Sequence, residues 1–502
     1  MNIRSTLFIL IFLLPATNSI AQKDSVSSDY QKAFSKFKKE IETEFNTFRL
    51  KNDSIFYRFL AESWEEFTLM RDVKKEQPKP NIQPKIHLQN KTEENIEIKP
   101  IKKREIEPEI QSLQNPKTLE KRPTPIQHKE GIAFNDRGFP EEDQGTAFDF
   151  FGEKLVIPTR SLPAVPKENS LNKKAADFYK ENSRDEQTAK TIAFLNQEAN
   201  RKDLNGWGFF NLVKAASLKL NNTLNDQILF TWFVLLKSGF DVRLGYNKKD
   251  LYLLANFDVP VYYNAYFELD GKKYHVITFD GQKEPSDKLN SYKGKYPKTL
   301  HALTLNIYKT PKLSEKTGKR TLHFNGKNLK INYNKNLVSF YSTYPECDLS
   351  VYFPAKLSTA ALKSLDKILK SEMKEGSPLQ KMNYLLNFVQ FAIQYKTDGE
   401  QFGRENYLFA EETLFYPYAD CEDRVVLLSR LVKHYLGFKG LALIYDGHVS
   451  YAVQMDDPKL EGAYVQYNGQ RYYIADPTYI GATVGMVMNK FQKQQPEILV
   501  LD

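Results

Sequence analysis

Residues 73–130 restrict the fold of this chain more than any other stretch. Eight prolines lie there among Lys, Glu, Gln and Asn, and the stretch contains no Phe, Tyr, Trp or Gly. Such a segment cannot bury enough apolar surface to offset the conformational entropy lost on folding. We therefore expect residues 73–130 to be a disordered, extended linker that divides the 502-residue chain into an N-terminal element and a folded body.

The first residues predict export from the cytoplasm. Arg4 precedes an apolar run from Leu7 to Leu14, and Pro15 and Ala21 follow it as in a signal peptide, which would comprise residues 1–21. The mature protein would then be periplasmic or secreted. No later segment approaches the roughly 20 apolar residues that a membrane-spanning helix needs, so we expect no membrane span in the mature chain.

Residues 28–72 predict a helical hairpin. Two apolar stripes at helical spacing lie on either side of a break at residues 52–54, and their members are Tyr30, Phe34, Phe37, Ile41, Phe45 and Phe48, then Phe56, Phe59, Leu60, Trp64 and Phe67. Two interpretations remain open. The hairpin docks on a partner such as a cell-envelope component, or its two helices cover each other's apolar faces.

The body after the linker predicts an α+β, multidomain fold. Residues 131–299 contain a strand near 148–157 and a run of helices over 171–238, and residues 300–355 suggest a β-rich connection. Its expected strands cover residues 303–308, 322–324, 329–333 and 337–341. Helices near 357–373 and 378–395 then open a C-terminal domain, residues 356–502.

A cysteine lies in the first turn of a predicted helix in that domain. Asp420-Cys421-Glu422-Asp423-Arg424 precedes apolar residues at three- and four-residue spacing. Asp420 is expected to cap this helix and Asp423 stands where a capping box has its acid. A helix N-terminus favours the thiolate, but three acidic neighbours disfavour it, so a base from elsewhere in the chain is needed.

The residues that follow supply a candidate base and a candidate acid. His448 begins a predicted strand after the Asp446-Gly447 turn, and Asp476-Pro477 ends a second hairpin whose turn is Asn468-Gly469. A cysteine on a helix start, a histidine on a strand and an aspartate on the neighbouring strand are the nucleophile, general base and orienting acid of covalent acyl transfer.

The order Asp-Cys-Glu-Asp-Arg, Gly-His-Val and Tyr-Tyr-Ile-Ala-Asp-Pro-Thr-Tyr resembles the transglutaminase-like superfamily of papain-type cysteine enzymes, over roughly residues 377–490. The resemblance implies that Cys421 is the nucleophile, His448 the base and Asp476 the residue that orients it. That superfamily includes protein cross-linkers, peptidases, amide hydrolases and catalytically inactive copies, so it does not fix the reaction.

The residues that would surround this triad are less defined. The backbone N–H of Cys421 is one oxyanion donor, and Gln390, Tyr395 or Gln401 could supply another, with nothing to choose among them. The glycine-containing segment 398–404 is a candidate cleft wall. Nearby aromatic residues line a substrate groove or simply pack in the core, namely Tyr407, Phe409, Phe415, Tyr416 and Tyr418.

The middle of the chain parallels this pattern. Residues 225–236 predict an apolar helix, Gly239-Phe240 matches Gly437-Phe438, and strands follow up to Asp280. We expect an internal repeat, a degenerate copy in which Gln227 stands at the place of the nucleophile and no histidine opens the strand at Leu251. Such a copy would serve as a binding or structural domain.

Other function classes have no support in the sequence. The net charge of +9 is spread without a basic block, so we expect no nucleic-acid binding. No phosphate-binding glycine loop or Cys/His metal cluster is present, and the triad needs no cofactor and no metal. Because exported proteins can form disulfides, Cys347 is a candidate partner for Cys421, although one bridge is sparse for this length.

The sequence therefore predicts an exported cysteine-dependent enzyme that acts on amide bonds of peptides or proteins, with hydrolysis favoured over cross-linking. One alternative is a protein cross-linking transglutaminase. The other is a non-catalytic scaffold that binds a peptide or an envelope partner.

Overall fold

The computed structural model describes residues 53–72 except 63, and residues 145–501 except 160, 164–169, 295, 297–298 and 458–459. The chain divides into two compact parts, Met1–Phe59 and Leu60–Asp502. The expected signal peptide, the first helix of the expected hairpin and the linker at 73–130 all lie outside the described residues. The α+β fold class is confirmed for the part that is described.

The end of the expected helical hairpin is not helical. Residues 53–60 form a helix, but Glu65–Thr68 and Met70–Arg71 are strands β1 and β2. The prediction of one hairpin over residues 28–72 is therefore wrong for its last residues. Phe67 and Leu69 alternate with exposed neighbours, as in a strand, and both pack against the core of a large sheet. Helical spacing had grouped Phe67 with the residues before it.

Residues 145–237 form a hairpin followed by four helices. The expected strand at 148–157 is two strands, β3 (Thr146–Phe150) and β4 (Glu153–Ile157). They are joined at Phe151 and Gly152, whose φ angles are 41° and 80°. The expected run of helices is confirmed as α2 (Leu171–Arg184), α3 (Glu186–Arg201), α4 (Gly206–Leu220) and α5 (Leu224–Lys237).

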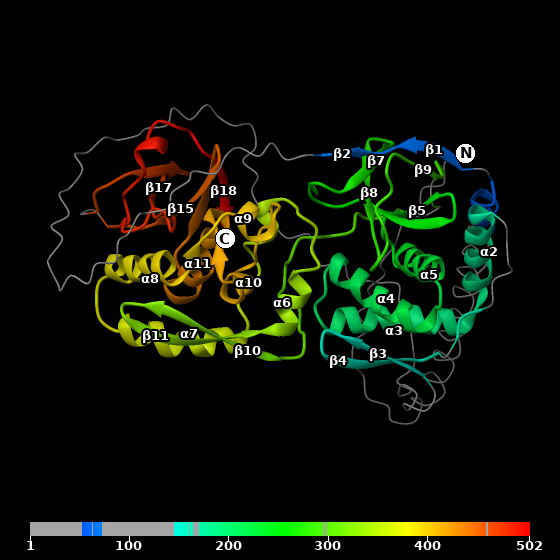
Figure 1. The fold of residues 1–502 in the computed structure, drawn as a ribbon, viewed down its shortest axis with the longest axis horizontal. Coiled ribbons are helices and arrows are strands. Elements are labelled where there is room, and N and C mark those ends of the chain that lie inside the picture. The colour runs from blue at the N-terminus through cyan, green and yellow to red at the C-terminus, as the bar shows by residue number, and fades with distance from the viewer. Residues whose placement is uncertain are drawn as a thin grey trace, which may run out of the picture. The chain divides into compact units, whose positions relative to one another are not determined.

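Seven antiparallel strands form a nearly closed barrel, in the order β1-β9-β5-β6-β8-β7-β2. Its five remaining strands are β5 (Val242–Asn247), β6 (Asp250–Ala255), β7 (Ala265–Leu269), β8 (Lys272–Ile277) and β9 (Lys288–Ser291). Because β1 and β2 are consecutive in the chain and pair with β9 and β7, one segment holds both edges of the sheet. We call residues 65–71 and 223–291 the barrel region (Figure 1).

The connection at 300–355 is less β-rich than expected. Only the hairpin of β10 (Thr317–Phe324) and β11 (Lys327–Asn334) is present, with the predicted turn at Asn325-Gly326. Residues 337–341 belong instead to helix α6 (Lys335–Tyr341), whose cap is the side chain of Asn334. Residues 303–308 make only an isolated bridge at Leu303, and a short helical turn, η2 (Leu349–Val351), follows.

The C-terminal domain places several helices before a five-stranded antiparallel sheet. The helices are α7 (Thr359–Glu372), α8 (Pro378–Ala392), α9 (Asp398–Phe402), α10 (Ala410–Phe415) and α11 (Cys421–Tyr435), with a small parallel pair, β12 (Gln394–Tyr395) and β13 (Tyr418–Ala419), between them. The segment 398–404, expected as a loop, is thus mostly helix α9.

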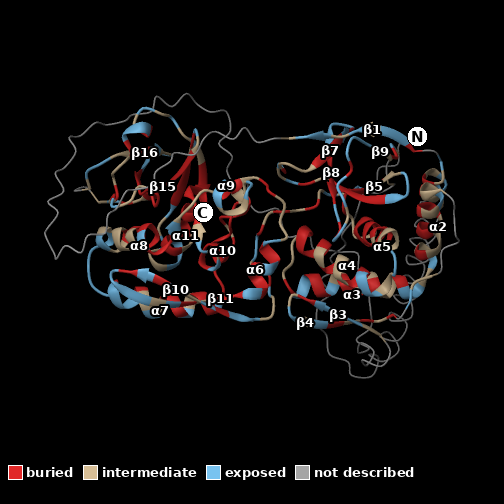
Figure 2. Ribbon diagram, viewed as in Figure 1, coloured by how far each residue is buried: buried red, intermediate tan, exposed pale blue. Residues whose placement is uncertain are grey.

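The sheet of this domain has the order β16-β17-β15-β14-β18 and curls into a half-barrel. Its strands are β14 (Gly440–Tyr445), β15 (His448–Gln454), β16 (Tyr464–Tyr467), β17 (Gln470–Ile474) and β18 (Glu497–Leu501), with a short turn η3 (Asn489–Phe491) before β18. We call residues 421–501 the half-barrel region. Helix α11 packs against β15 and is buried along most of its length (Figure 2).

The two regions share strand order and register. The order β9-β5-β6-β8-β7 matches β18-β14-β15-β17-β16, and the pairing is antiparallel throughout. Val242 pairs with Ala255 as Gly440 pairs with Val453, and Tyr266 with His275 as Tyr464 with Tyr473. Adding 198, the separation of Val242 and Gly440, converts every pair of β5–β8 except Leu253–Ile277 into a pair of β14–β17.

This register revises the expected alignment of the two helices. Helix α5 ends at Lys237 and α11 at Tyr435, which again differ by 198. Residue 223 therefore corresponds to residue 421, so Thr223, the cap of α5, stands at the place of Cys421. The assignment of Gln227 to that place is wrong. Asp250 corresponds to His448 and Thr278 to Asp476.

Candidate functional site

The helix start that carries Cys421 has the expected capping box. Asp420 is the N-cap of α11 and Asp423 is its third residue, and each side chain interacts with the other's backbone N–H. Asp423 also accepts a hydrogen bond of 2.8 Å from the backbone N–H of Leu408. These contacts fix the first turn of α11 and with it the backbone of Cys421, the first helical residue.

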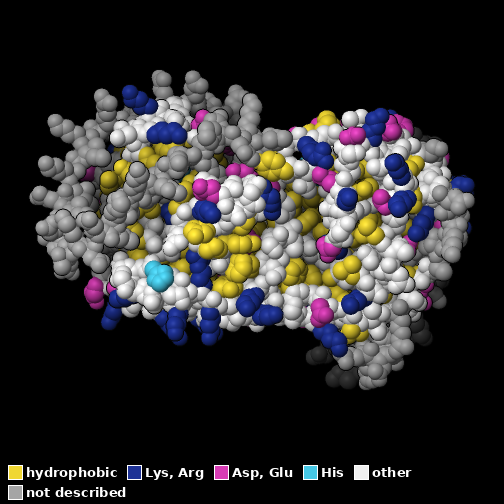
Figure 3. Space-filling view, viewed as in Figure 1, with side chains coloured by type: hydrophobic (Ala, Val, Ile, Leu, Met, Phe, Trp, Pro, Cys, Tyr) yellow, Lys and Arg dark blue, Asp and Glu magenta, His cyan; other side chains and the backbone are white. Residues whose placement is uncertain are grey.

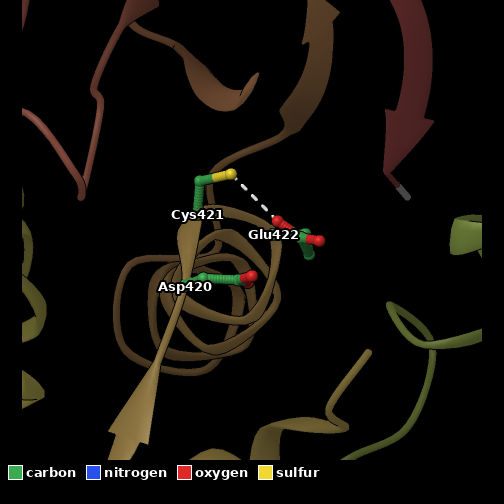
Figure 4. Close-up of side chains that lie close together, drawn as sticks. All are labelled: Asp420, Cys421 and Glu422. Carbon is green, nitrogen blue, oxygen red and sulfur yellow. Dashed lines mark hydrogen bonds between the residues drawn. The ribbon is translucent and has the colours of Figure 1, made fainter. Parts of the chain in front are cut away.

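The thiol of Cys421 is buried and bonded to its neighbour. Its Sγ donates to Glu422 Oε2 at 2.9 Å, and the Cys421 residue is 1% exposed. Figure 4 shows the sulfur pointing toward the Glu422 carboxylate, with the Asp420 side chain below them in this view. This contact could not be predicted from the sequence, because adjacent helical residues do not normally face each other.

His448 and Asp476 come together as the sequence predicted. His448 Nε2 lies 2.7 Å from Asp476 Oδ2, and both side chains are buried. Because a carboxylate accepts hydrogen bonds, this contact assigns a ring hydrogen to Nε2. The other ring nitrogen, Nδ1, is buried and has no hydrogen-bond partner among the described residues. Its lone pair is therefore available to a proton donor.

An aromatic ring that the sequence did not point to covers the imidazole. Phe491, from η3, stacks on His448 with ring centroids 4.8 Å apart and an interplanar angle of 14°. Tyr445, which pairs with His448 across the β14–β15 turn, contacts the same phenyl ring at 4.9 Å. The stacked Phe491 ring holds the plane of the imidazole and excludes water from one of its faces.

The carboxylate of Asp476 is held by its own loop. Its Oδ1 accepts hydrogen bonds from the backbone N–H groups of Thr478, at 2.8 Å, and Tyr479, at 3.3 Å. The second oxygen, Oδ2, then points to His448. The orientation of the acid is thus a property of the turn that follows β17.

Arg424, in the first turn of α11, has a structural role. The residue is 1% exposed, and its guanidinium donates to the backbone carbonyls of Pro477, at 3.1 Å, and Ile393. Burial lowers the pKa of Arg424 to about 10, and Tyr395 and then Asp420 oppose that shift. The residue therefore stays charged at neutral pH and ties the Cys421 helix to the Asp476 loop.

One of the three candidate oxyanion donors is used elsewhere. The side-chain amide of Gln390 is fully engaged with backbone groups of residues 476–482. Gln401 Nε2 donates to the carbonyl of Tyr418 at 3.3 Å, and Tyr395 pairs with Ala419 in the β12–β13 ladder. Gln401 and Tyr395 therefore lie close to the chain that enters Cys421, and the choice between them stays open.

Two of the five aromatic residues upstream of Cys421 are packing residues. Phe409 stacks on Tyr341 at 4.1 Å and contacts Tyr352 at 4.6 Å, and Tyr407 contacts Tyr352 at 5.6 Å. Both Phe409 and Tyr407 are buried, whereas Phe415 is 38% exposed. The core interpretation is correct for Phe409 and Tyr407.

The two cysteines do not pair. Cys347 and Cys421 are both buried, and neither forms a disulfide. The Cys347 thiol instead contacts the hydroxyl of Tyr352 at 3.7 Å, and burial raises the pKa of Cys347 well above its usual value. The expected alternative of a Cys347–Cys421 bridge is therefore wrong for this structure, and Cys347 is an inert core residue.

Acidic side chains gather around the start of α11. Asp398, Glu405 and Glu422 bring one carboxylate oxygen each within 4.8 Å of one another, and Asp420, Cys421 and Glu422 form a second such group. Oxygen donors of this kind suit a hard divalent cation. Because the second group includes the thiol, a bound metal would compete with its use as a nucleophile.

Charged side chains of both signs lie on the surface. On the face in Figure 3, basic side chains are interspersed with acidic and uncharged ones. Among the described residues, no helix is long and apolar enough to cross a membrane. No protein-family model, curated protein or solved structure matches the chain.

Proposed function

We propose that residues 356–502 are a transglutaminase-like domain that cleaves amide bonds of peptides or proteins through Cys421, His448 and Asp476. The observation that supports this most is the buried pair of His448 Nε2 and Asp476 Oδ2 at 2.7 Å, with Nδ1 of the same ring left to accept a proton. An orienting carboxylate on one ring nitrogen and a free lone pair on the other is what a general base requires.

The proposed reaction begins with a rotation of the Cys421 side chain away from Glu422. The thiol gives its proton to His448 Nδ1, and the sulfur attacks the amide carbonyl carbon to form a tetrahedral oxyanion. The backbone N–H of Cys421, at the helix start, is the expected donor to that oxyanion. The C–N bond then breaks as the imidazolium returns the proton to the leaving amine.

Water completes the cycle in the hydrolytic version. His448 takes a proton from water, the hydroxide attacks the thioester carbonyl, and the C–S bond breaks to give the acid and the free thiol. Asp476 holds the imidazole and offsets its positive charge throughout. Hydrolysis is favoured because an exported acyl-enzyme meets abundant water; a primary amine in place of water would give cross-linking.

The shared strand register supports a second part of the proposal. We infer that the barrel region is a degenerate copy of the half-barrel region, with Thr223, Asp250 and Thr278 in place of the three triad residues. None of these can act as a thiol nucleophile or an imidazole base. The barrel region would then be a structural or binding domain.

One observation favours the alternative of a non-catalytic scaffold. The Cys421 thiol is 1% exposed and donates to a carboxylate rather than to His448. If that arrangement is permanent, Cys421 is a buried core thiol, and residues 356–502 bind a peptide or an envelope partner without cleaving it.

Alkylation of Cys421 by iodoacetamide across pH separates the two functions. We expect labelling well below pH 8, read by mass spectrometry at Cys421, and a loss of about tenfold or more at pH 6.5 in His448→Ala. His434→Ala, at the end of the same helix, is the matched control and should leave the rate unchanged. A wild-type rate no higher than that of an ordinary thiol, unaffected by His448→Ala, would support the scaffold.

Export remains a proposal that rests on residues 1–21 alone. It predicts that the mature protein starts at Gln22, which intact-mass measurement of the protein purified from its native host would check. A mature chain that retains residues 1–21 would contradict it.

A further inference from the structure

The side chain of Gln390 hydrogen-bonds to the loop that carries Asp476. Its side chain, on α8, is 2% exposed. The amide nitrogen donates to the backbone carbonyls of Asp476 at 3.1 Å, Tyr479 at 2.9 Å and Ala482 at 3.0 Å. The amide oxygen accepts from the N–H of Gly481 at 3.2 Å. One side chain therefore binds four backbone groups of a seven-residue turn.

This use of a buried amide determines the shape of the turn. Two N–H hydrogens are shared among three carbonyls, so the carbonyls must converge on one point. The carbonyl of Tyr479 also accepts from the backbone N–H of Ala482 at 3.0 Å, but a buried polar group that loses a partner costs about 1–3 kcal/mol. A donor at position 390 therefore stabilises this conformation of residues 476–482.

The shape of this turn also determines where the carboxylate of Asp476 points. Asp476 Oδ1 accepts from the N–H groups of Thr478 and Tyr479, which lie inside the gripped segment. If these N–H groups move, Oδ2 moves relative to His448 Nε2. From the opposite side Arg424, on the Cys421 helix, holds the carbonyl of Pro477 at 3.1 Å.

We propose that Gln390 is a positioning residue of the triad, acting through Asp476 to hold the imidazole of His448 in the Nε2–H form. The inference deepens the proposed function and its kinetic part rests on it. It replaces the expected oxyanion role of Gln390, because an amide already bound to backbone groups has no donor left for an oxyanion.

The same helix offers a matched control. Asn383 lies seven residues before Gln390, two turns away on the same face of α8, and its Oδ1 accepts from the N–H of Val484 at 2.8 Å. It therefore holds the same chain segment beyond the turn around Asp476. Asn383→Leu loosens the segment without touching the carbonyls that Gln390 binds.

The test compares Gln390→Met with Asn383→Leu in the full chain. Protein labelled with ¹⁵N in its seven histidines reports the His448 ring, assigned by its loss in His448→Ala. We expect the wild type and Asn383→Leu to show the Nε2–H form, and Gln390→Met to show a mixture of tautomers. Iodoacetamide labelling of Cys421 at pH 6.5 should fall about tenfold in Gln390→Met and less than twofold in Asn383→Leu.

The outcomes separate this inference from the proposed function. A wild-type Nε2–H ring that Gln390→Met disturbs, with an unreactive Cys421 in every variant, would support the positioning role and overturn the enzyme. Gln390→Met with an unchanged ring signal and labelling within twofold of wild type would overturn the positioning role. If Gln390→Met does not fold, the near-isosteric Gln390→Glu replaces it, since it keeps the acceptor and loses the donors.

Discussion

The barrel region and the half-barrel region have the same strand order and register, yet they treat the equivalent positions differently. Cys421, His448 and Asp476 are all buried, whereas Thr223, Asp250 and Thr278 are exposed. The shared strand order and register therefore do not by themselves bury these positions. Burial of a thiol and an imidazole requires coverage that the barrel region does not provide at this end of the sheet.

A single pair of residues illustrates the difference. Asn225 corresponds to Asp423, and both are near the start of the equivalent helices. Asn225 spans the gap to the β5–β6 turn, donating to the carbonyl of Lys249 at 2.8 Å and accepting from the N–H of Leu251 at 2.9 Å. Asp423 binds its own cap and Leu408 instead. In the half-barrel region the helix start is therefore not bonded to the turn before His448 through this position.

The inner faces of the two sheets are also filled differently. Phe67 and Leu69 of the edge segment pack on the core of the barrel, where Phe67 stacks on Phe267 at 4.5 Å. The corresponding core of the half-barrel is completed by Met488 and Phe491. Because Phe491 also stacks on His448, the segment that fills this core is the one that shapes the candidate site.

The largest expected effect comes from placing a cysteine in the barrel region. Thr223→Cys in a Cys421→Ser background should give an exposed thiol with an ordinary pKa of about 8.5. At pH 6 we expect it to react with iodoacetamide roughly 30-fold more slowly than wild-type Cys421, because no imidazole faces it. Equal rates at the two positions would break the comparison and leave the triad without a role.

A buried acid gives the half-barrel side a characteristic pH dependence. Burial raises the pKa of Glu412, on α10, to about 8 from 4.5. A raised folded-state pKa means that stability is fully present below pH 4.5 and is lost as the pH rises toward 8. Glu412→Gln should therefore be more stable than wild type at pH 8.5, by roughly 2–4 kcal/mol, and similar at pH 4.5.

Thermal unfolding at both pH values measures this difference. Glu372→Gln, at an exposed position on α7, is the control and should change stability little at either pH. A Glu412→Gln advantage that is the same at pH 4.5 and pH 8.5 would mean that Glu412 titrates normally.

A buried histidine in the barrel region makes stability depend on pH in the opposite direction. Burial and then the charge of Lys273 lower the pKa of His275 to about 4. A lowered folded-state pKa of a base means that stability is present above pH 6.5 and is lost as the pH falls through 4. His275→Tyr introduces the residue type found at the equivalent half-barrel position, Tyr473. The substitution should reduce the stability lost on acidification by roughly 2–3 kcal/mol.

The quantity that tests this prediction is the change in the free energy of unfolding of His275→Tyr between pH 7 and pH 4. The packing cost of the larger tyrosine ring is the same at both pH values, so it does not affect this difference. Denaturant unfolding followed by circular dichroism at several pH values supplies that difference. A difference in His275→Tyr equal to that of the wild type would assign the acid sensitivity to other groups.

The smallest expected effect concerns the bridge made by Asn225. Asn225→Ala removes two hydrogen bonds between α5 and the β5–β6 turn and should cost about 1–2 kcal/mol of stability. Asn247→Ala, on the same hairpin, is the control. Hydrogen exchange at Leu251 should accelerate only in Asn225→Ala; unchanged protection there would show that the bridge does not hold the turn.

The sequence determined the local features of the site. The capping box at Asp420 and Asp423, the helix that starts at Cys421 and the two hairpins of the half-barrel follow from spacing and turn residues over a few positions. The pairing of His448 with Asp476 could also be predicted, because neighbouring strands bring their ends together. Local rules failed where tertiary contacts outweighed them, as at residues 65–71 and in helix α6.

Only the tertiary structure decided what surrounds the triad. Three contacts join residues far apart in the chain. Phe491 stacks on His448, Gln390 hydrogen-bonds to the turn after Asp476, and Arg424 donates to the carbonyl of Pro477. A sequence states which groups can donate or accept, but burial decides which of them must find partners. That is why the contacts of Gln390 and Arg424 followed from the fold, whereas the three candidate site residues followed from the chain.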